Sequence, residues 1–437
     1  MRTTALLQEH QVRHPLQKKA ILAAQHQPPL HLPLHLAAQQ TVVNKMVQLQ
    51  HIKALNSIQL EELGFTWHTD SDNTTYISDS LVQVTHNEAE AYYEAANEIY
   101  DMYVEAASHV IENNLFFELG IPFNLIDAIK KSWENDVHWH IYGRFDFAGG
   151  IDGKPIKLLE FNADTPTSLF ETALLQWGLL KANNMDENEQ FNNVYEAIQK
   201  NFRRLITLFE DTELFDERYD GWKILFSSIH GNDEEEATTK LLRQMATDAG
   251  FNTGFEYLGD VRFDEEGIYD RDDNAYEYWF KLYPWEDIAT DEPELATTLT
   301  NIMQNQNAII LNPAYTLLFQ SKGMLKILYD LFPDSPYLLK TSFEPLKGQK
   351  HVAKTVFGRE GANVAIFGSD GALLEEQEGV YGNHKRVYQE YAELPKDKEG
   401  AKYQAGVFFA YEACGLGFRK GGEILNNMSK FVGHVLV

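Results

Sequence analysis

Cysteine is nearly absent from this chain of 437 residues, which contains a single one, Cys414. A lone cysteine cannot form a disulfide within the chain, and this favours a reducing compartment such as the cytoplasm. The residue itself is either a nucleophile or, as is more common for a free cysteine, a small core residue. The sequence therefore predicts a cytoplasmic protein without a disulfide framework.

Long hydrophobic runs and basic residues are also scarce. The apolar fraction is 44%, and no stretch approaches the roughly 20 continuous apolar residues of a membrane span. Lysine and arginine number 37 against 65 acidic residues, for a net charge of −28. This charge argues against nucleic acid as a partner, and no membrane partner is expected either. A cationic substrate such as a polyamine suits an acidic protein, although solubility alone also explains the charge.

The first 45 residues differ in composition from the remainder. They are rich in Gln, His, Leu and Pro, contain one acidic residue, Glu9, and lack a sustained hydrophobic period. A cleaved targeting peptide is one interpretation of this basic segment. We expect instead a disordered or artefactual extension, residues 1–45, ahead of a core that begins near Met46.

Beyond Met46 the pattern alternates between helices and strands. Helices are predicted from Asn87 to Asn113 and from Ser168 to Leu180, the second with Ser168 and Glu171 spaced as a capping box. Residues 222–258 have the pattern of a strand, a helix and a strand, which predicts a parallel βαβ layer. The acidic run 233–236 would lie in the first helical turn, where it suits the helix dipole, with metal binding as the alternative.

One segment, from Arg144 to Ser168, combines apolar runs with polar residues. Two apolar runs flank the turn-rich AGGIDGKP, which predicts a β-hairpin with its turn near Ile151 or Asp152. Because side chains alternate along a strand, four polar residues share one face: Arg144, Asp146, Glu160 and Asn162. The opposite, core-facing side would then carry Phe145, Phe147, Leu159 and Phe161.

Two carboxylates on one hairpin face repel each other unless a positive charge lies between them. Arg144 supplies one such charge, and Mg²⁺, which prefers carboxylate and amide oxygens, could supply more at Asp146, Glu160 and Asn162. The alternative is a solvated face with an ion pair between Arg144 and Glu160, worth roughly 0 to 1 kcal/mol. The pattern by itself leaves both interpretations open.

Two later stretches have features of phosphate sites. Lys354 lies on a short predicted strand before the turn GREG, whose glycines let backbone N–H groups approach an anion. GREG is neither a Walker loop nor a dinucleotide motif, and it is also compatible with an ordinary hairpin turn. Further on, KRVYQEYAEL predicts an extended segment beside an adenine, and Arg419 between glycines could hold a carboxylate or a phosphate.

Six motifs, taken in order, resemble those of one known family: RFDF, LEFNADTPTS, NPAYTLLFQSKGML, VAKTVFGREGANV, VYQEY and GFRKGG. From about Met46 to Val437 the chain is similar to the synthetase half of glutathionylspermidine synthase and its stand-alone relatives. The resemblance implies a mixed α+β chain with an ATP-grasp fold and a preceding α/β, pre-ATP-grasp-like layer. We expect an N-terminal part at 46–220, the α/β layer at 221–310 and the ATP-binding lobe at 311–437.

The resemblance also implies residue roles. Arg144 and Arg419 correspond to catalytic arginines, and the magnesium ligands correspond to Asp146, Glu160 and Asn162. The nucleotide site would include Lys322, Lys354, Gly358, Arg359, Gly361, Gln389 and Glu390. Thr165 and Thr167 would bind substrate, in place of serines in the bifunctional enzyme, and this exchange leaves glutathione open as a substrate.

The implied activity is that of an ADP-forming ligase that uses ATP and Mg²⁺. A peptide or small-molecule carboxylate would be phosphorylated to an acyl phosphate, and a polyamine or another amine would displace the phosphate to form an amide. The amidase of the bifunctional enzyme needs a cysteine nucleophile, and Cys414 lies inside the ligase region, so amidase activity is not expected. The alternatives are a catalytically silent ATP-grasp-like binding protein and a kinase-like phosphotransferase.

Overall fold

The computed structural model describes residues 45–69, 73–208, 210–426 and 428–437. The expected N-terminal extension, residues 1–45, lies outside this part of the chain except for Lys45. None of the helices within these ranges combines the length and the apolarity that a bilayer crossing requires.

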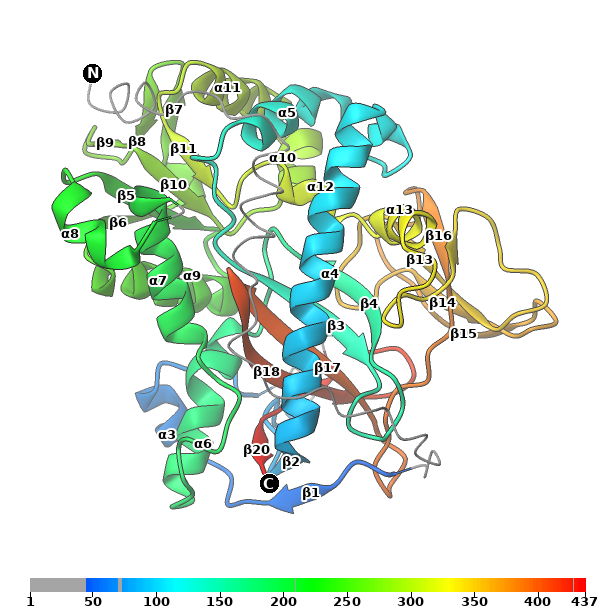
Figure 1. Cartoon of the computed structure of the whole chain (residues 1–437). Helices are drawn as coiled ribbons and strands as arrows, with labels where there is room; N and C mark the ends of the chain where they lie inside the picture. The colour runs from blue at the N-terminus through cyan, green and yellow to red at the C-terminus, as the bar shows by residue number, and fades with distance from the viewer. Residues whose placement is uncertain (1–44, 70–72, 209, 427) are drawn as a thin grey trace.

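A five-stranded antiparallel sheet, in the order β19-β18-β17-β3-β4, forms the centre of the molecule (Figure 1). Its strands are β3 (Gly143–Ala148), β4 (Lys157–Asn162), β17 (Lys402–Ala410), β18 (Glu412–Gly421) and β19 (Lys430–Val432). The long helix α4 (His86–Glu112) packs along this sheet and confirms the predicted helix. Thr85 and Glu88 form the capping box at its start.

The aromatic core lies between α4 and the hairpin β3–β4. Tyr103 of α4 packs on Phe161 with ring centroids 5.2 Å apart, and Phe161 stacks on Phe145 at 3.8 Å. Phe145, Phe147 and Phe161 are buried, as predicted for this face. The opposite face of the hairpin is consequently the one that can present polar groups.

The hairpin contains a β-bulge that alters one prediction. Pairing shifts between Asp146 and Phe147, so that Phe147 pairs with Leu158. Leu158 is fully buried, whereas Leu159 lines a pocket on the polar side. The placement of Leu159 in the core is therefore wrong, because a bulge inserts one residue and reverses the alternation beyond it.

A parallel sheet in the order β11-β10-β5-β6 lies beside the central one. The unit β5 (Lys223–Ser228), α9 (Asp233–Asp248) and β6 (Asn252–Tyr257) confirms the predicted βαβ layer. The layer also includes β10 (Tyr278–Lys281), α10 (Trp285–Asp291), α11 (Pro293–Gln304) and β11 (Ile309–Leu311). A small antiparallel sheet is attached to it, formed by β7 (Arg262–Asp264), β8 (Gly267–Tyr269) and β9 (Ala275–Tyr276).

A third main sheet, in the order β12-β16-β13-β14-β15, projects to one side of the molecule and is drawn in yellow and orange in Figure 1. Its strands are β12 (Thr341–Ser342), β13 (His351–Thr355), β14 (Val364–Phe367), β15 (Leu373–Gln377) and β16 (Arg386–Glu390). Helices α12 (Thr316–Gln320) and α13 (Met324–Leu331) precede it along the chain. One face of this sheet lies toward the central hairpin, since Val352 and Lys354 of β13 line a pocket together with Leu159 and Glu160 of β4.

The remaining elements surround these sheets. A three-stranded sheet combines β1 (Leu49–His51), β2 (Ser80–Val84) and β20 (His434–Leu436). The outer helices are α3 (Ser57–Glu62), α5 (Ile126–Glu134), α6 (Gln176–Ala182), α7 (Val194–Thr207) and α8 (Phe215–Arg218).

The predicted capping box at Ser168 is wrong. Ser168 has a φ of +63°, and its Oγ is buried without a hydrogen-bond partner among the described residues. An N-cap residue needs extended backbone, which this left-handed conformation does not provide. A π-helical turn (Glu171–Leu175) follows and leads into α6. Glu171 accepts a bond from the Trp67 Nε1 at 3.4 Å instead of capping a helix.

Candidate active site

The polar face of the β3–β4 hairpin is held by an ion pair. Arg144 pairs in register with Asn162, and Asp146 pairs with Glu160. The Arg144 guanidinium donates from Nε to Asp146 Oδ1 at 2.7 Å and from Nη2 to Oδ2 at 3.0 Å. Asp146 is only 2% exposed. The alternative of a solvated face with an Arg144–Glu160 ion pair is therefore wrong.

The three predicted magnesium ligands lie together. Asn162 Nδ2 is 3.2 Å from Asp146 Oδ2 and 3.4 Å from Glu160 Oε1, and Gln404 of β17 donates to the same Asp146 oxygen at 2.9 Å. The described residues contain no group of three His, Cys, Asp or Glu side chains that could hold a metal. Two carboxylates and an amide oxygen fit Mg²⁺ when substrate oxygens complete the shell, provided that the amide of Asn162 turns its oxygen inward.

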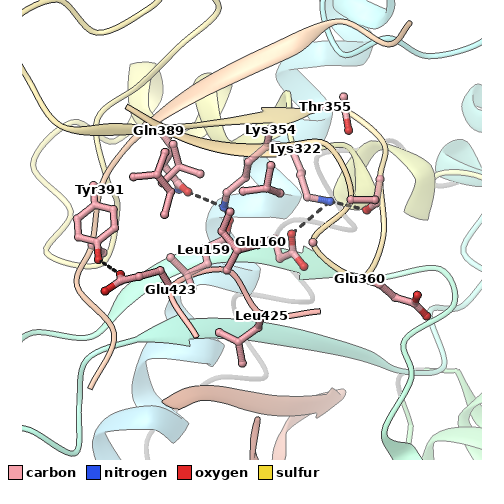
Figure 2. A pocket seen from close by; sticks show the side chains of 18 of the residues that line it. Leu159, Glu160, Lys322, Lys354, Thr355, Glu360, Gln389, Tyr391, Glu423 and Leu425 are labelled. Carbon is pink, nitrogen blue, oxygen red and sulfur yellow. Dashed lines mark hydrogen bonds and ion pairs between the residues drawn. The ribbon is translucent and has the colours of Figure 1, made fainter. Parts of the chain in front are cut away.

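A pocket of about 800 Å³, including its open mouth, lies between this hairpin and the third sheet (Figure 2). Charged groups gather around Glu160 at one end, and apolar side chains form much of the remaining wall. The lining comprises residues 358–362 together with Leu159, Glu160, Lys322, Val352, Lys354, Thr355, Val364, Ile366, Gln389, Glu390, Tyr391, Ala392, Leu394, Glu423, Ile424 and Leu425. Its lining, with lysines at one end and apolar side chains along the wall, suits a nucleotide.

The two predicted nucleotide lysines reach into the pocket from different segments (Figure 2). Lys354 of β13 donates to Gln389 Oε1 at 2.9 Å and to the Leu159 carbonyl at 3.0 Å. Lys322 Nζ lies 3.2 Å from Glu160 Oε2 and donates to the Gly358 carbonyl at 2.8 Å. Both ammonium groups thus face the carboxylate end of the pocket.

These contacts change the acidities of the groups. Burial opposes ionisation of Glu160, but the charges of Lys322 and Lys354 outweigh it and lower the pKa of Glu160 to about 2. Burial lowers the pKa of Lys354 to about 8, although Glu160 acts in the opposite direction. The charged end of the pocket therefore holds one ionised carboxylate that faces two lysines. This end of the pocket can accept further negative charge.

The turn GREG closes over the pocket. Gly361 has a φ of +71°, and a Cβ at this position would lie 2.3 Å from the Leu425 carbonyl oxygen. Arg359 contributes to the lining, but its Nη2 donates to Thr165 Oγ1 at 2.7 Å and lies 3.9 Å from Glu286 Oε1. Its guanidinium thus bridges the turn and the segment that follows β4.

The remaining predicted nucleotide residues line the same pocket. Gln389 of β16 is buried and donates from Nε2 to the Leu158 carbonyl at 3.0 Å, while the Glu390 side chain is exposed. At the end remote from Lys322, Tyr391 donates to Glu423 Oε2 at 2.5 Å (Figure 2). Glu423 was not predicted, although it directly follows the motif GFRKGG.

A smaller hollow of about 260 Å³, including its open mouth, is lined by Asp146, the strand partner of Glu160. It is also lined by Arg144 and Arg419, the two predicted catalytic arginines. Arg419 donates from Nε to the Ser429 carbonyl at 3.0 Å and from Nη2 to the Asn426 carbonyl at 2.9 Å. The structure therefore brings the two arginines to one cavity.

Thr167 of the predicted substrate pair is engaged with one of these arginines. Its carbonyl accepts from Arg144 Nη1 at 2.6 Å, and its hydroxyl lies 3.4 Å from the same nitrogen. Thr165 faces Arg359 instead. The two threonines consequently point to different parts of the site.

Four carboxylates lie near Arg359 and Arg419 and form a group that we call the acidic cleft: Glu234, Glu235, Glu286 and Asp287. Glu234 and Glu235 belong to the first turn of α9, as predicted, and the other two begin α10. Burial raises the pKa of Glu234 to about 8 and that of Glu286 to about 7. One buried oxygen each of Glu235 and Glu286 has no hydrogen-bond partner in the described part of the chain. The cleft can therefore receive a cation.

Cys414 is a core residue. It is 2% exposed, and its thiol donates to the Phe408 carbonyl at 3.4 Å. Burial raises the pKa of this thiol far above its ordinary value. A thiol that remains protonated and buried cannot act as a nucleophile.

The chain matches the family model described as glutathionylspermidine synthase preATP-grasp over residues 47–437. A Haemophilus influenzae protein that carries the provisional name acid–amine ligase is 30% identical over 396 residues, which cover 87% of this chain and 96% of that protein. The bifunctional glutathionylspermidine synthetase/amidase of Escherichia coli is 25% identical over 345 residues, covering 72% of this chain and 52% of that enzyme.

Trypanothione synthetase of Crithidia fasciculata is 25% identical over 353 residues, covering 76% of this chain and 52% of that enzyme. This chain therefore spans about half the length of the longer relatives. Among solved structures, a glutathione synthetase-like effector of Globodera pallida matches with a TM-score of 0.52 over 88% of this chain and 98% of that one, at 11% identity. This likeness concerns the fold alone.

Proposed function

This chain is a carbon–nitrogen ligase that belongs to the glutathionylspermidine synthase preATP-grasp family, and we propose that it joins a carboxylate to an amine through an acyl phosphate at the expense of ATP. The proposal includes an ATP-grasp architecture, in which the β13–β14 turn and the central hairpin enclose the nucleotide. It also includes a cytoplasmic setting, in which ATP is available.

One observation carries the proposal: Glu160, Lys322 and Lys354 meet where the nucleotide pocket approaches the cavity of the two arginines. Glu160 lines the pocket, and its strand partner Asp146 lines the smaller cavity. A phosphate bound to the lysines and a carboxylate bound to the arginines would therefore face each other across one strand pair. Phosphoryl transfer depends mostly on such positioning and charge neutralisation.

In the first step Arg144 and Arg419 bind the substrate carboxylate and orient one of its oxygens. That oxygen forms a bond to the γ-phosphorus of ATP, and ADP leaves with the electrons of the broken bond. Lys322 and Lys354 bind phosphate oxygens throughout. Mg²⁺ held by Asp146, Glu160 and Asn162 would neutralise further phosphate charge.

In the second step the amine nitrogen forms a bond to the acyl carbon, and inorganic phosphate leaves. The acidic cleft suits an amine that enters as an ammonium ion. Glu286 and Glu234, with pKa values of about 7 and 8, can take the proton that the nitrogen must lose. Closure of the GREG turn would keep water away from the acyl phosphate.

A cationic amine with more than one charge, such as a polyamine, is the amine class that the cleft favours. Three of the cleft carboxylates, Glu235, Glu286 and Asp287, have Arg359 as their nearby cation, so added positive charge is stabilised there. For the acid, a peptide or small-molecule carboxylate is proposed. Amidase activity is not proposed, since Cys414 is unsuited to nucleophilic attack.

A screen of carboxylates, glutathione included, against mono- and polyamines tests the function. ADP release is followed by a coupled assay, and the product is identified by mass spectrometry. Amide formed in proportion to ADP is the expected result. ADP with a phosphorylated acid but no amide would favour the kinase-like alternative, and nucleotide binding without turnover would favour a silent binding protein.

A further inference from the structure

A fully buried ion pair joins the parallel sheet to the segment that follows β4. Lys281, the last residue of β10, places Nζ at 2.9 and 3.2 Å from the two carboxylate oxygens of Asp164. Both side chains have 0% exposure. Asp164 Oδ2 also accepts from the backbone N–H of Trp285 at 2.9 Å, and the Lys281 ammonium lies 4.6 Å from the centre of the Trp285 ring.

The backbone around Asp164 is held by two further buried side chains. Gln320 Oε1 accepts from the N–H groups of Ala163 at 2.9 Å and Asp164 at 3.2 Å. Asn312 Nδ2 donates to the carbonyls of Ala163 at 3.2 Å and Asp164 at 2.8 Å. The path of the chain at the exit of β4 is therefore defined by side chains from three separate segments.

The residues that come next are part of the candidate site. Thr165 receives a bond from Arg359, and Thr167 receives one from Arg144. On the other side of the ion pair, Trp285 directly precedes Glu286 of the acidic cleft. Lys281 and Asp164 thus connect the cleft to the two threonines.

The ion pair is a poor candidate for a purely stabilising role. Removing two charges from water costs several kcal/mol for each ion, and a buried pair is often no more stable than apolar residues of similar volume. Such a pair can instead fix the relative position of the two segments that it joins. Its geometry is specific, and its members tolerate little displacement. A displacement of about 1 Å in an active site can reduce turnover a hundredfold.

We propose that Lys281 is a positioning residue of the ligase. By holding Asp164, it sets the path of residues 164–168, and so the distance of Thr165 from Arg359 and that of Thr167 from Arg144. It touches neither the nucleotide pocket nor the small cavity as they are lined here. This inference rests on the proposed function for its effect on turnover, but its effect on local structure can be measured separately.

The test compares Lys281→Met with the double variant Lys281→Met/Asp164→Asn. The single variant leaves a buried carboxylate without its cation and should lose about 4 °C in Tm. The double variant removes both charges while keeping an acceptor for the Trp285 N–H, and its Tm should return to within about 1 °C of the native value. Tyr403→Phe, which removes a buried hydrogen bond to Asp397 outside the network, is the matched control.

Three measurements follow on the native protein, the double variant and the control. Hydrogen exchange, read by mass spectrometry on peptides that contain residues 163–168, should accelerate at least tenfold in the double variant alone. Turnover, with the acid and amine on which the native protein is active, should fall about a hundredfold. The Kd for ADP should change less than threefold, because other residues bind the nucleotide.

Full turnover in the double variant, or unchanged exchange of residues 163–168, would overturn the positioning role. Turnover that recovers together with Tm would show that the pair is structural. If the native protein has no turnover with any acid and amine, the proposed function fails, while the exchange measurement still decides whether Lys281 holds this segment.

Discussion

Lys322 and Glu160 form an ion pair of 3.2 Å at the charged end of the proposed nucleotide pocket. Lys322 lies between α12 and α13, and Glu160 belongs to the central hairpin, so the contact joins two segments that are distant in the sequence. Lys322 also donates to the carbonyl of Gly358 in the GREG turn. The same ammonium thus links the proposed metal carboxylate to the turn that closes the pocket.

Glu160→Gln should abolish most of the turnover. The carboxylate is a proposed Mg²⁺ ligand, and deletion of one electrostatic group of an active site costs a hundredfold or more in kcat. Turnover is measured over a magnesium titration, with Glu376→Gln, a change at an exposed position of β15, as the control. Native turnover of Glu160→Gln at limiting magnesium would remove Glu160 from the metal site.

The same substitution should lower stability at neutral pH. The pKa of Glu160 is lowered to about 2, so the folded chain favours the carboxylate. This contribution is fully present above the ordinary glutamate value and is lost as pH falls through 2. Glu160→Gln removes it and leaves Lys322 and Lys354 facing each other, and Tm at pH 7 should fall by several degrees. An unchanged Tm would contradict the ion-pair argument.

Nucleotide affinity should decrease above pH 8. Burial lowers the pKa of Lys354 to about 8, so its ammonium is lost near this pH when the pocket is empty. Between about pH 8 and about pH 10.4, the ordinary lysine pKa, the folded chain binds fewer protons at Lys354 than the unfolded chain does. Considered alone, this group therefore makes the free energy of unfolding rise with pH in this range. The charge needed to bind phosphate is lost over the same window.

Calorimetric titration with ADP at pH 7 and 9 measures this effect, and Kd should increase about tenfold. Lys354→Arg keeps its charge throughout this range and should show a much flatter profile. Equal pH dependence in the two proteins would assign the effect to another group.

Gly361→Ala should weaken ATP binding at least tenfold. Its φ of +71° is unfavourable for alanine, and the added Cβ would lie 2.3 Å from the Leu425 carbonyl oxygen, so the turn must move away from the pocket wall. Gly371 has a φ of +83° with nothing within 4 Å of an added Cβ. Gly371→Ala therefore has the same kind of backbone cost without the clash, and its KM for ATP should stay within twofold of the native value.

Local periodicity was sufficient to predict the elements that build the site. The alternation of residues 144–162 placed Arg144 and Asp146 on one face, and the βαβ layer followed from residues 222–258. The bulge beyond Asp146 was not predictable, because one inserted residue leaves the apolar pattern plausible in either register. Leu159 consequently lines the nucleotide pocket and not the core.

The acidic cleft and the buried network could not be predicted for a different reason. Glu235 and Glu286 begin two helices that lie far apart in the sequence, and only the packing of the parallel sheet brings them to Arg359. Lys281 meets Asp164 across a sequence distance of 117 residues. Contacts of this kind leave no spacing or period for a sequence pattern to reveal.

A carboxylate can attack ATP at the γ-phosphorus, which gives ADP and an acyl phosphate, or at the α-phosphorus, which gives AMP and an acyl adenylate. Lys322 and the GREG turn gather at the charged end of the pocket, beside Glu160, whose strand partner Asp146 lines the arginine cavity. This arrangement favours attack at the terminal phosphate, because positive charge and the proposed metal lie there.

With an acid and an amine that the protein joins, ADP, inorganic phosphate and amide should form in equal amounts. An acid labelled with ¹⁸O in its carboxylate should transfer one labelled oxygen to the released phosphate, since that oxygen forms the bond to the γ-phosphorus and leaves with it when the amine attacks. Mass spectrometry of the phosphate and the amide checks both halves of the transfer. A reaction with unlabelled acid, run in ¹⁸O water, should leave the phosphate unlabelled, whereas label from water would indicate simple hydrolysis of ATP. Formation of AMP and pyrophosphate in proportion to amide would show that activation occurs at the α-phosphorus, and the assignment of the charged end to the terminal phosphate would then be wrong.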